Sequence, residues 1–189
     1  MVRKKYSLGL KQDGRLNVRQ LVYMGLLVGI GALLMITIQI PIFTEYLMYD
    51  PSDVAMLIGG FWFGPLAGIV MSFFKVLIYL FSKGLAGPVG AMANFFATAA
   101  FIGVASLIYQ RERTFAGAIK GMVGGTVAMV IISGFTNYFI ALPLWGIPEE
   151  ALLPMIFTAT TPFNIARGVI SSLLTLPVYK RVKNLLQSI

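Results

Sequence analysis

Long apolar runs alternate with short polar segments along the chain, and the first run shows the pattern most clearly. It extends from Val18 to Ile40, and about 20 apolar residues are enough for a helix to cross a membrane. Glycine, proline or charged residues separate the later runs, as expected between helices. We therefore predict an all-α integral membrane protein with six transmembrane helices in one domain, 18–189, after a basic tail, 1–17. The helices are expected at residues 18–40, 53–64, 66–82, 88–109, 115–142 and 156–179.

The second and third predicted helices are short, and only Gly64 and Pro65 separate them. This connection is too tight for a solvated loop. Proline cannot continue a regular helix, and irregular backbone inside a membrane must be buried in protein. We therefore expect a broken helix pair at this point.

Composition strengthens the membrane assignment. The chain has 189 residues, of which 58% are hydrophobic and 12% charged, with a mean hydropathy of +0.83. So few charges cannot cover a soluble surface. The chain also has no cysteine and no histidine, which excludes disulfides, thiolate chemistry and histidine-based zinc or haem sites. We expect no catalytic residues, no metal, no cofactor and no enzyme activity.

The charged residues divide between the two predicted sides of the membrane. With both termini in the cytoplasm, the cytoplasmic segments hold most of the 15 lysines and arginines, and the external turns hold five of the seven acids: Glu45, Asp50, Asp53, Glu149 and Glu150. Basic residues near span ends set orientation. The net charge of +8 therefore indicates topology in a multi-pass plasma-membrane protein. No basic and aromatic pattern typical of nucleic-acid binding accompanies it.

Three asparagines are predicted to lie inside the membrane at one depth. Asn94, Asn137 and Asn164 each fall roughly 8 to 12 Å below the external surface at about 1.5 Å rise per residue. Asparagine often ties neighbouring helices together, and this structural reading stays open for each of them. Their common depth favours a ligand site, to which Lys83 and Thr161 would add polar groups. A ring of amides suits a neutral ligand with imide or alcohol groups.

The predicted external loop at residues 41–49 is more apolar than a solvated loop requires. It can fold inward as a lid that packs on a flat hydrophobic ligand. Alternatively, its aromatic residues form an interfacial belt, the explanation that we favour for Trp145. The candidate lid residues are Thr44, Glu45, Tyr46, Leu47 and Met48.

Two further basic residues lie within the predicted spans. Lys75 and Arg167 are expected to be structural counter-charges to Asp53, or to extend toward the membrane surface, in preference to contacting a ligand.

Small residues recur on one face of the first predicted helix. Gly25, Gly29 and Ala32 lie about one turn apart, and such a strip allows close approach of another helix. The spacing does not say whether that helix is internal or belongs to another subunit.

Four segments carry a resemblance to a known family. Residues 49–53 (Tyr-Asp-Pro-Ser-Asp), the glycine-spaced run 59–68, the helix start 87–94 and the segment 162–164 resemble the riboflavin-binding S component of energy-coupling factor (ECF) vitamin transporters. The likeness covers nearly the whole chain and is most specific over residues 49–68.

The resemblance implies a six-helix substrate-binding subunit that captures riboflavin from outside the cell. It also implies a transmembrane coupling subunit and two ATPases as partners, with Gly25, Gly29 and Ala32 matching the family's coupling strip. The chain has no phosphate-binding Gly-x-x-x-x-Gly-Lys motif, so ATP hydrolysis must come from a partner. The alternative is a stand-alone small-solute permease, although neither an internal repeat nor coupling carboxylates are evident.

Overall fold

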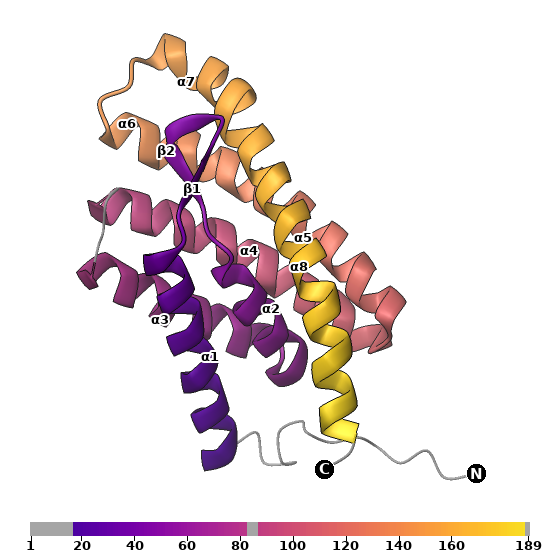
Figure 1. Cartoon of the computed structure of the whole chain (residues 1–189). Helices are drawn as coiled ribbons and strands as arrows, with labels where there is room; N and C mark the ends of the chain where they lie inside the picture. Colours follow the sequence, from indigo (N-terminus) through magenta and orange to yellow (C-terminus); the bar gives the residue numbers. More distant parts are fainter. Residues whose placement is uncertain (1–16, 83–86, 188–189) are drawn as a thin grey trace.

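The protein is an elongated helical bundle with one small β-hairpin near one end (Figure 1). The computed structural model describes residues 17–82 and 87–187, without the side chains of Glu45, Tyr46 and residues 182–187. The elements are α1 (Val18–Thr37), β1 (Ile40–Ile42), β2 (Thr44–Tyr49), α2 (Ser52–Phe63), α3 (Pro65–Ser82), α4 (Gly87–Glu112), α5 (Phe115–Thr136), the π-helix η1 (Asn137–Ala141), α6 (Leu142–Leu144), α7 (Glu149–Met155), the π-helix η2 (Ile156–Thr160) and α8 (Thr161–Gln187).

The helical architecture predicted from the hydrophobic pattern is confirmed. Within the described ranges, four helices are long and apolar enough to cross a membrane: Val18–Thr37, Pro65–Ser82, Gly87–Glu112 and Phe115–Leu144. α2 spans only 12 residues, or roughly 18 Å, which is shorter than a hydrocarbon layer of about 30 Å. Because four helices are long enough to cross, the chain is a multi-pass membrane protein.

The connection between α2 and α3 is the tight break that the sequence predicts. Gly64 alone separates the two helices and has a φ of 100°, a backbone conformation that favours glycine. Its N–H donates to the carbonyl oxygen of Gly60 at 2.9 Å, and its own carbonyl accepts from the N–H of Gly68 at 3.0 Å. The turn therefore satisfies its backbone groups without water.

Close backbone contact between α4 and α5 forms the centre of the bundle. A Cβ atom added at Gly121 would lie 2.5 Å from the carbonyl oxygen of Ala105, and one at Gly125 would lie 2.5 Å from that of Phe101. Only glycine permits this approach. The short helix α2 is buried beside this pair, with Met56 and Leu57 fully enclosed in the core.

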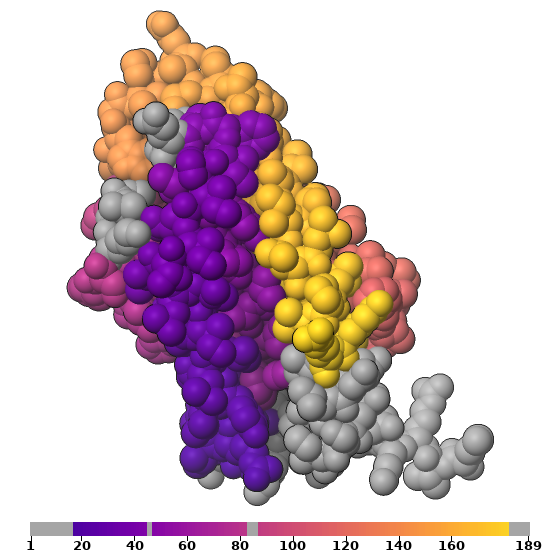
Figure 2. All heavy atoms as spheres, in the orientation of Figure 1, coloured from indigo at the N-terminus to yellow at the C-terminus, as the bar shows by residue number. Residues whose placement is uncertain are grey.

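Residues 40–49 form an antiparallel β-hairpin, whereas the sequence predicts an irregular lid loop. Ile40 pairs with Tyr49 and Pro41 with Met48, and Phe43 takes a φ of 66° in the turn. Pairing satisfies backbone groups that an extended apolar segment would otherwise expose. Figure 2 shows this hairpin and α8 on one face of the molecule.

The ends of the first and last predicted helices also differ from the structure. α1 ends at Thr37, before the hairpin begins, whereas helix was expected to Ile40. The last helix was expected over residues 156–179, but α7, η2 and α8 continue without a break from Glu149 to Gln187. The wide turns of η2 follow Pro154, whose ring removes one regular backbone hydrogen bond.

Candidate functional site

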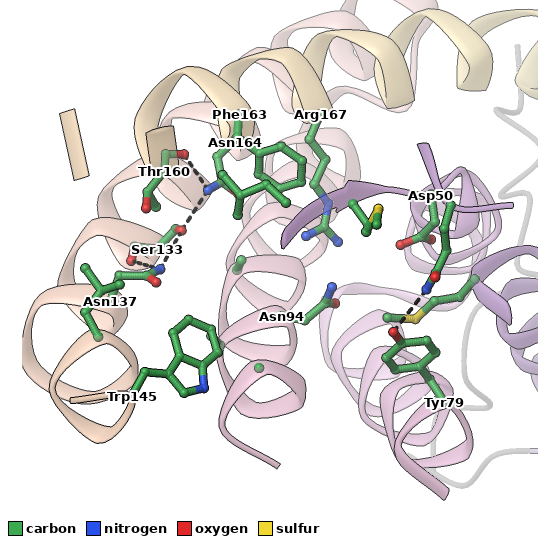
Figure 3. A pocket seen from close by; sticks show the side chains of 18 residues that line it. Asp50, Tyr79, Asn94, Ser133, Asn137, Trp145, Thr160, Phe163, Asn164 and Arg167 are labelled. Carbon is green, nitrogen blue, oxygen red and sulfur yellow. Dashed lines mark hydrogen bonds between the residues drawn. The ribbon is translucent and has the colours of Figure 1, made fainter. Parts of the chain in front are cut away.

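A cavity of about 370 Å³ lies between the hairpin, α4 and the ends of α5 and α8 that face α6 and α7 (Figure 3). Its volume falls within the range of small-molecule sites, about 300–1,000 Å³. The lining comes from nearly every part of the chain: Met35, Gln39, Leu47, Met48, Asp50, Tyr79, Gly90, Ala93, Asn94, Ala97, Ser133, Asn137, Leu142, Trp145, Thr160, Phe163, Asn164 and Arg167.

The three asparagines predicted at one depth all line this cavity. Asn164 donates from Nδ2 to Ser133 Oγ and to the carbonyl oxygen of Thr160, both at 2.8 Å. Asn137 donates from Nδ2 to the carbonyl oxygen of Ser133 at 2.8 Å. These bonds hold the two amides in place (Figure 3). Asn164 therefore both ties two helices together and lines the cavity, whereas Asn137 bonds within its own helix and lines the cavity.

Each of these amides keeps one polar atom without a hydrogen bond to the described part of the chain. Asn137 and Asn164 have used Nδ2, which leaves each Oδ1 as an acceptor. Asn94 instead accepts from Thr98 Oγ1 at 3.2 Å through its Oδ1, which leaves Nδ2 as a donor. The cavity thus offers acceptors on one side and a donor on another.

A buried charge cluster lies beneath the amides. Asp53 Oδ2 accepts from Arg167 Nε at 2.8 Å, and Asp53 Oδ1 accepts from Arg167 Nη2 at 3.0 Å and from Lys75 Nζ at 3.1 Å. Asp53 and Lys75 are 0% exposed and Arg167 is 3% exposed. Lys75 also donates to Ser52 Oγ at 2.8 Å, and Arg167 Nη2 donates to Thr98 Oγ1 at 2.7 Å. The cluster joins α2, α3, α4 and α8.

This cluster corrects the prediction that Asp53 lies in an external turn at the membrane rim. The preference of acids for the first turn of a helix does place Asp53 near the start of α2. That helix start, however, is buried below the hairpin. Lys75 and Arg167 are both counter-charges to Asp53, as expected, and Arg167 additionally lines the cavity.

The segment that joins β2 to α2 orients one more carboxylate. Asp50 Oδ1 accepts from the N–H of Ser52 at 3.0 Å, which forms an Asx-type turn around Pro51. Asp50 is 3% exposed and lines the cavity. Tyr49 precedes it, and its hydroxyl lies 3.4 Å from Ser171 Oγ on α8. This contact fixes the hairpin against the last helix.

Apolar surfaces cover the rest of the cavity. Leu47 and Met48 of the hairpin line it, as do Leu142 and Phe163. Trp145, which we assigned to an interfacial belt, is 43% exposed and also lines the cavity. Its position at the edge of the site in Figure 3 follows from the turn after α6.

Several predicted site residues lie elsewhere. Thr44 is not part of the cavity lining, and its Oγ1 is buried without a partner among the described residues. Thr161 is half-buried and also does not line the cavity. Lys83 and the side chains of Glu45 and Tyr46 lie outside the described residues, so their roles stay predictions.

Sequence reasoning missed several polar residues of the site. Ser133 lies one helical turn before Asn137 and shares its face, a signal that the i, i+4 spacing carries. Gln39 and Tyr79 bond to each other, with Gln39 Nε2 donating to the Tyr79 hydroxyl oxygen at 3.0 Å. They are 40 residues apart, and no local pattern joins them.

The three small residues of the strip on α1 differ in how closely the rest of the protein surrounds them. A Cβ atom added at Gly25 or Gly29 would meet no atom within 4 Å. Ala32, in contrast, is 3% exposed and packs inside the bundle. The open part of the strip is therefore Gly25 and Gly29.

The fold and the cavity define a helical membrane protein that encloses a small ligand among amides and apolar side chains. A family model for the substrate-specific component of ECF transporters matches residues 19–179. The chain belongs to this family. Because the family consists of transporter components, it agrees with the expectation that the chain is not an enzyme.

Similar proteins of known type cover almost the full length of the chain. The riboflavin transporter RibU of Staphylococcus aureus is 37% identical over 93% of this chain and 97% of its own. The riboflavin transporter FmnP of Bacillus subtilis is 30% identical over 89% of this chain and 94% of its own. A solved structure of the S component of a bacterial ECF transporter has a TM-score of 0.78 and 34% identity, with 89% of this chain and 97% of that one covered.

Proposed function

We propose that this protein captures riboflavin at the external side of the plasma membrane, as the substrate-specific subunit of an ATP-driven ECF importer. The observation that carries the proposal is the cavity in which three asparagine amides face apolar side chains of the hairpin and α8. The relatives named as riboflavin transporters support the choice of vitamin.

The chemistry of the cavity fits a flavin. The isoalloxazine ring has a flat apolar face and an imide edge, and its sugar-alcohol chain carries hydroxyls. Leu47, Met48 and Phe163 provide apolar contact area, while Asn94, Asn137 and Asn164 provide a donor and acceptors. Lys83, Glu45 and Tyr46 stay in the proposed ligand set, whereas Thr44 and Thr161, which do not line the cavity, are no longer part of it.

Charge balance favours a neutral ligand. Lys75 and Arg167 both pair with Asp53, and the second carboxylate at the floor, Asp50, brings the formal charge of these four groups to zero. A buried site without net charge provides no excess charge that would offset the desolvation of an ionic ligand. Neutral riboflavin suits such a site.

The distribution of charges supports an orientation for the bundle. Arg111, Arg113, Lys120, Lys180 and Arg181 lie at the ends of α4, α5 and α8 away from the cavity. Basic residues favour the cytoplasmic side. The cavity then opens outward, six helices cross the membrane within the single domain 18–189, and the tail 1–17 and the C-terminus are cytoplasmic.

Absorption and fluorescence of the purified protein test the ligand. The protein is expected to retain a yellow flavin whose fluorescence is quenched by enclosure in the cavity. Titration of flavin-free protein with riboflavin should restore this spectrum, whereas a cationic vitamin such as thiamine should not bind. A colourless protein that binds no riboflavin in titration would contradict the proposal. Uptake by vesicles that contain this chain alone would favour a stand-alone permease.

Energy must come from a coupling subunit and two ATPases, and the open strip on α1 is the proposed docking face. Changing Gly25 and Gly29 together to Leu is expected to weaken docking about tenfold, because small residues permit close helix contact in membranes. Flavin affinity of the isolated chain should not change, since no atom lies within 4 Å of either Cβ position. ATP-driven uptake and co-purification of the coupling subunit measure the effect.

The matched control is Ile30→Trp, which adds bulk at a 50% exposed position on the same helix. It should leave docking intact. Normal uptake by the double glycine variant would show that another face of the protein binds the coupling subunit.

A further inference from the structure

A second cavity, the α5–α8 groove, lies on the outer side of the bundle away from the candidate site. It has a volume of about 540 Å³. Its lining includes Ile119, Val123, Val127 and Ile131 of α5 and Val169 and Leu173 of α8. Most of these side chains are exposed, with Val123 61% and Leu173 63% accessible. In a membrane protein such a surface contacts hydrocarbon.

The two hydroxyl-bearing residues of the groove use their hydrogen-bond donors within the protein. Thr126 Oγ1 donates to the carbonyl oxygen of Met122 at 2.8 Å, and Ser172 Oγ donates to that of Gly168 at 2.6 Å. Both hydroxyls therefore bond to their own helices. The groove therefore suits an aliphatic chain better than it suits a polar solute.

The shape of the groove follows from how the two helices meet. A Cβ atom added at Gly168 would lie 2.5 Å from Thr126 Oγ1, so the helices touch closely at this point. Toward the C-terminus of α8 and the N-terminus of α5 they draw apart in Figure 1. From Ile119 to Ile131 the groove extends roughly 18 Å at about 1.5 Å per residue. One leaflet, half of a hydrocarbon layer of about 30 Å, has nearly this depth.

A positive charge lies at the open end of the groove. Lys180 follows Leu176, a groove residue, by one helical turn. Its Nζ lies 4.7 Å from the centre of the Phe115 ring, and Phe115 precedes Ile119 by one turn on α5. Both Lys180 and the neighbouring Arg181 are exposed. Phe115 and Lys180 therefore place a ring and a cation at this end of the groove.

We propose that the α5–α8 groove binds one anionic glycerophospholipid. The acyl chain lies along the groove, and the phosphate of the headgroup contacts Lys180. The length of one leaflet, the satisfied hydroxyls and the cation at the groove's end all fit this ligand. Basic side chains at a membrane surface attract anionic lipids.

A partner helix suits the groove less well than a lipid chain. Helix contacts in membranes concentrate small residues, and the open strip on α1 has them. The surface of the groove is instead formed by branched aliphatic side chains such as Val127, Ile131 and Val169. α5 packs on α4 and α8, while α1 packs on α2 and α3, so the two surfaces belong to different helices.

Lipid retention by the purified full-length chain tests the inference. The protein is placed in nanodiscs of equal phosphatidylglycerol and phosphatidylcholine, extracted into detergent, and its retained lipids are measured by native mass spectrometry. At least fivefold enrichment of phosphatidylglycerol is expected. Val169→Trp, which fills the groove, should abolish retention of both lipids. Lys180→Gln should keep a bound lipid but remove the preference.

Matched variants on other helices separate a site from general lipid contact. Leu33→Trp adds the same side chain at a 63% exposed position of α1, and Arg111→Gln removes an exposed cation at the end of α4. Both should retain phosphatidylglycerol as the wild type does. Thermal unfolding of each variant shows that it is folded.

Two results would overturn the inference. One is equal retention of the two lipids by the wild type, or retention that Val169→Trp leaves unchanged in folded protein. The other is efficient cross-linking from a Val127→Cys variant to the coupling subunit in an assembled transporter, because a protein would then cover the groove. Neither result depends on flavin binding.

Discussion

Replacing Asp53 by Asn is expected to lower the free energy of unfolding by about 3–5 kcal/mol, since it removes one partner from a buried ion cluster. Lys75 and Arg167 would then be left with two positive charges inside the bundle and no carboxylate between them. Because the cluster joins four helices, the loss should affect the whole fold. Thermal unfolding in detergent, followed by circular dichroism, measures the change.

The exposed ion pair between Glu112 and Lys120 is the matched control. Its side chains are 44% and 62% accessible, and its atoms are 2.9 Å apart. Exposed pairs contribute about 0–1 kcal/mol, so Glu112→Gln should leave the midpoint nearly unchanged. Equal stability of Asp53→Asn and Glu112→Gln would show that the buried cluster contributes no more than a surface pair.

Replacing Asn164 by Ala is expected to weaken riboflavin binding by about 1–3 kcal/mol, or roughly 5- to 150-fold. The substitution removes the Oδ1 acceptor proposed to meet the ligand. It also removes the Nδ2 bonds to Ser133 and Thr160, of which the first joins α8 to α5. Fluorescence-quenching titration with flavin-free protein gives the affinity.

Thr158→Ala controls for a general effect of changing this region. Thr158 lies in η2 within two turns of Asn164, is exposed, and bonds only to the carbonyl oxygen of Pro154 in the described structure. The affinity of the Thr158→Ala variant for riboflavin should equal that of the wild type. Unaltered affinity in a folded Asn164→Ala variant would remove Asn164 from the proposed ligand set.

The buried cluster also keeps the polar groups of the site in fixed positions. Asp53 holds Lys75 and Arg167 by ion pairs at the floor, which fixes the position of Arg167 in the cavity lining. Asn137 and Asn164 are likewise held by Ser133 and Thr160. A site whose polar groups are already ordered loses less conformational entropy on binding.

Two π-helices lie next to two of the asparagines. η1 begins at Asn137, and η2 ends one turn before Asn164. A π turn shifts the direction of the side chains that follow it, so η2 contributes to the orientation of Asn164. Hydrophobic periodicity contains no signal for these turns, although the common depth of the three amides was visible in their spacing.

The sequence by itself determined the helical membrane class and the broken pair at Gly64, and the spacing of Asn94, Asn137 and Asn164 grouped three residues that line one cavity. These features depend on local composition and spacing, which are properties of neighbouring residues. Only the tertiary structure decided that residues 40–49 pair as a hairpin, that Asp53 is buried, and that Gln39 meets Tyr79. These outcomes depend on contacts between residues far apart in the chain, because a buried polar group takes whichever partner the packed helices bring to it.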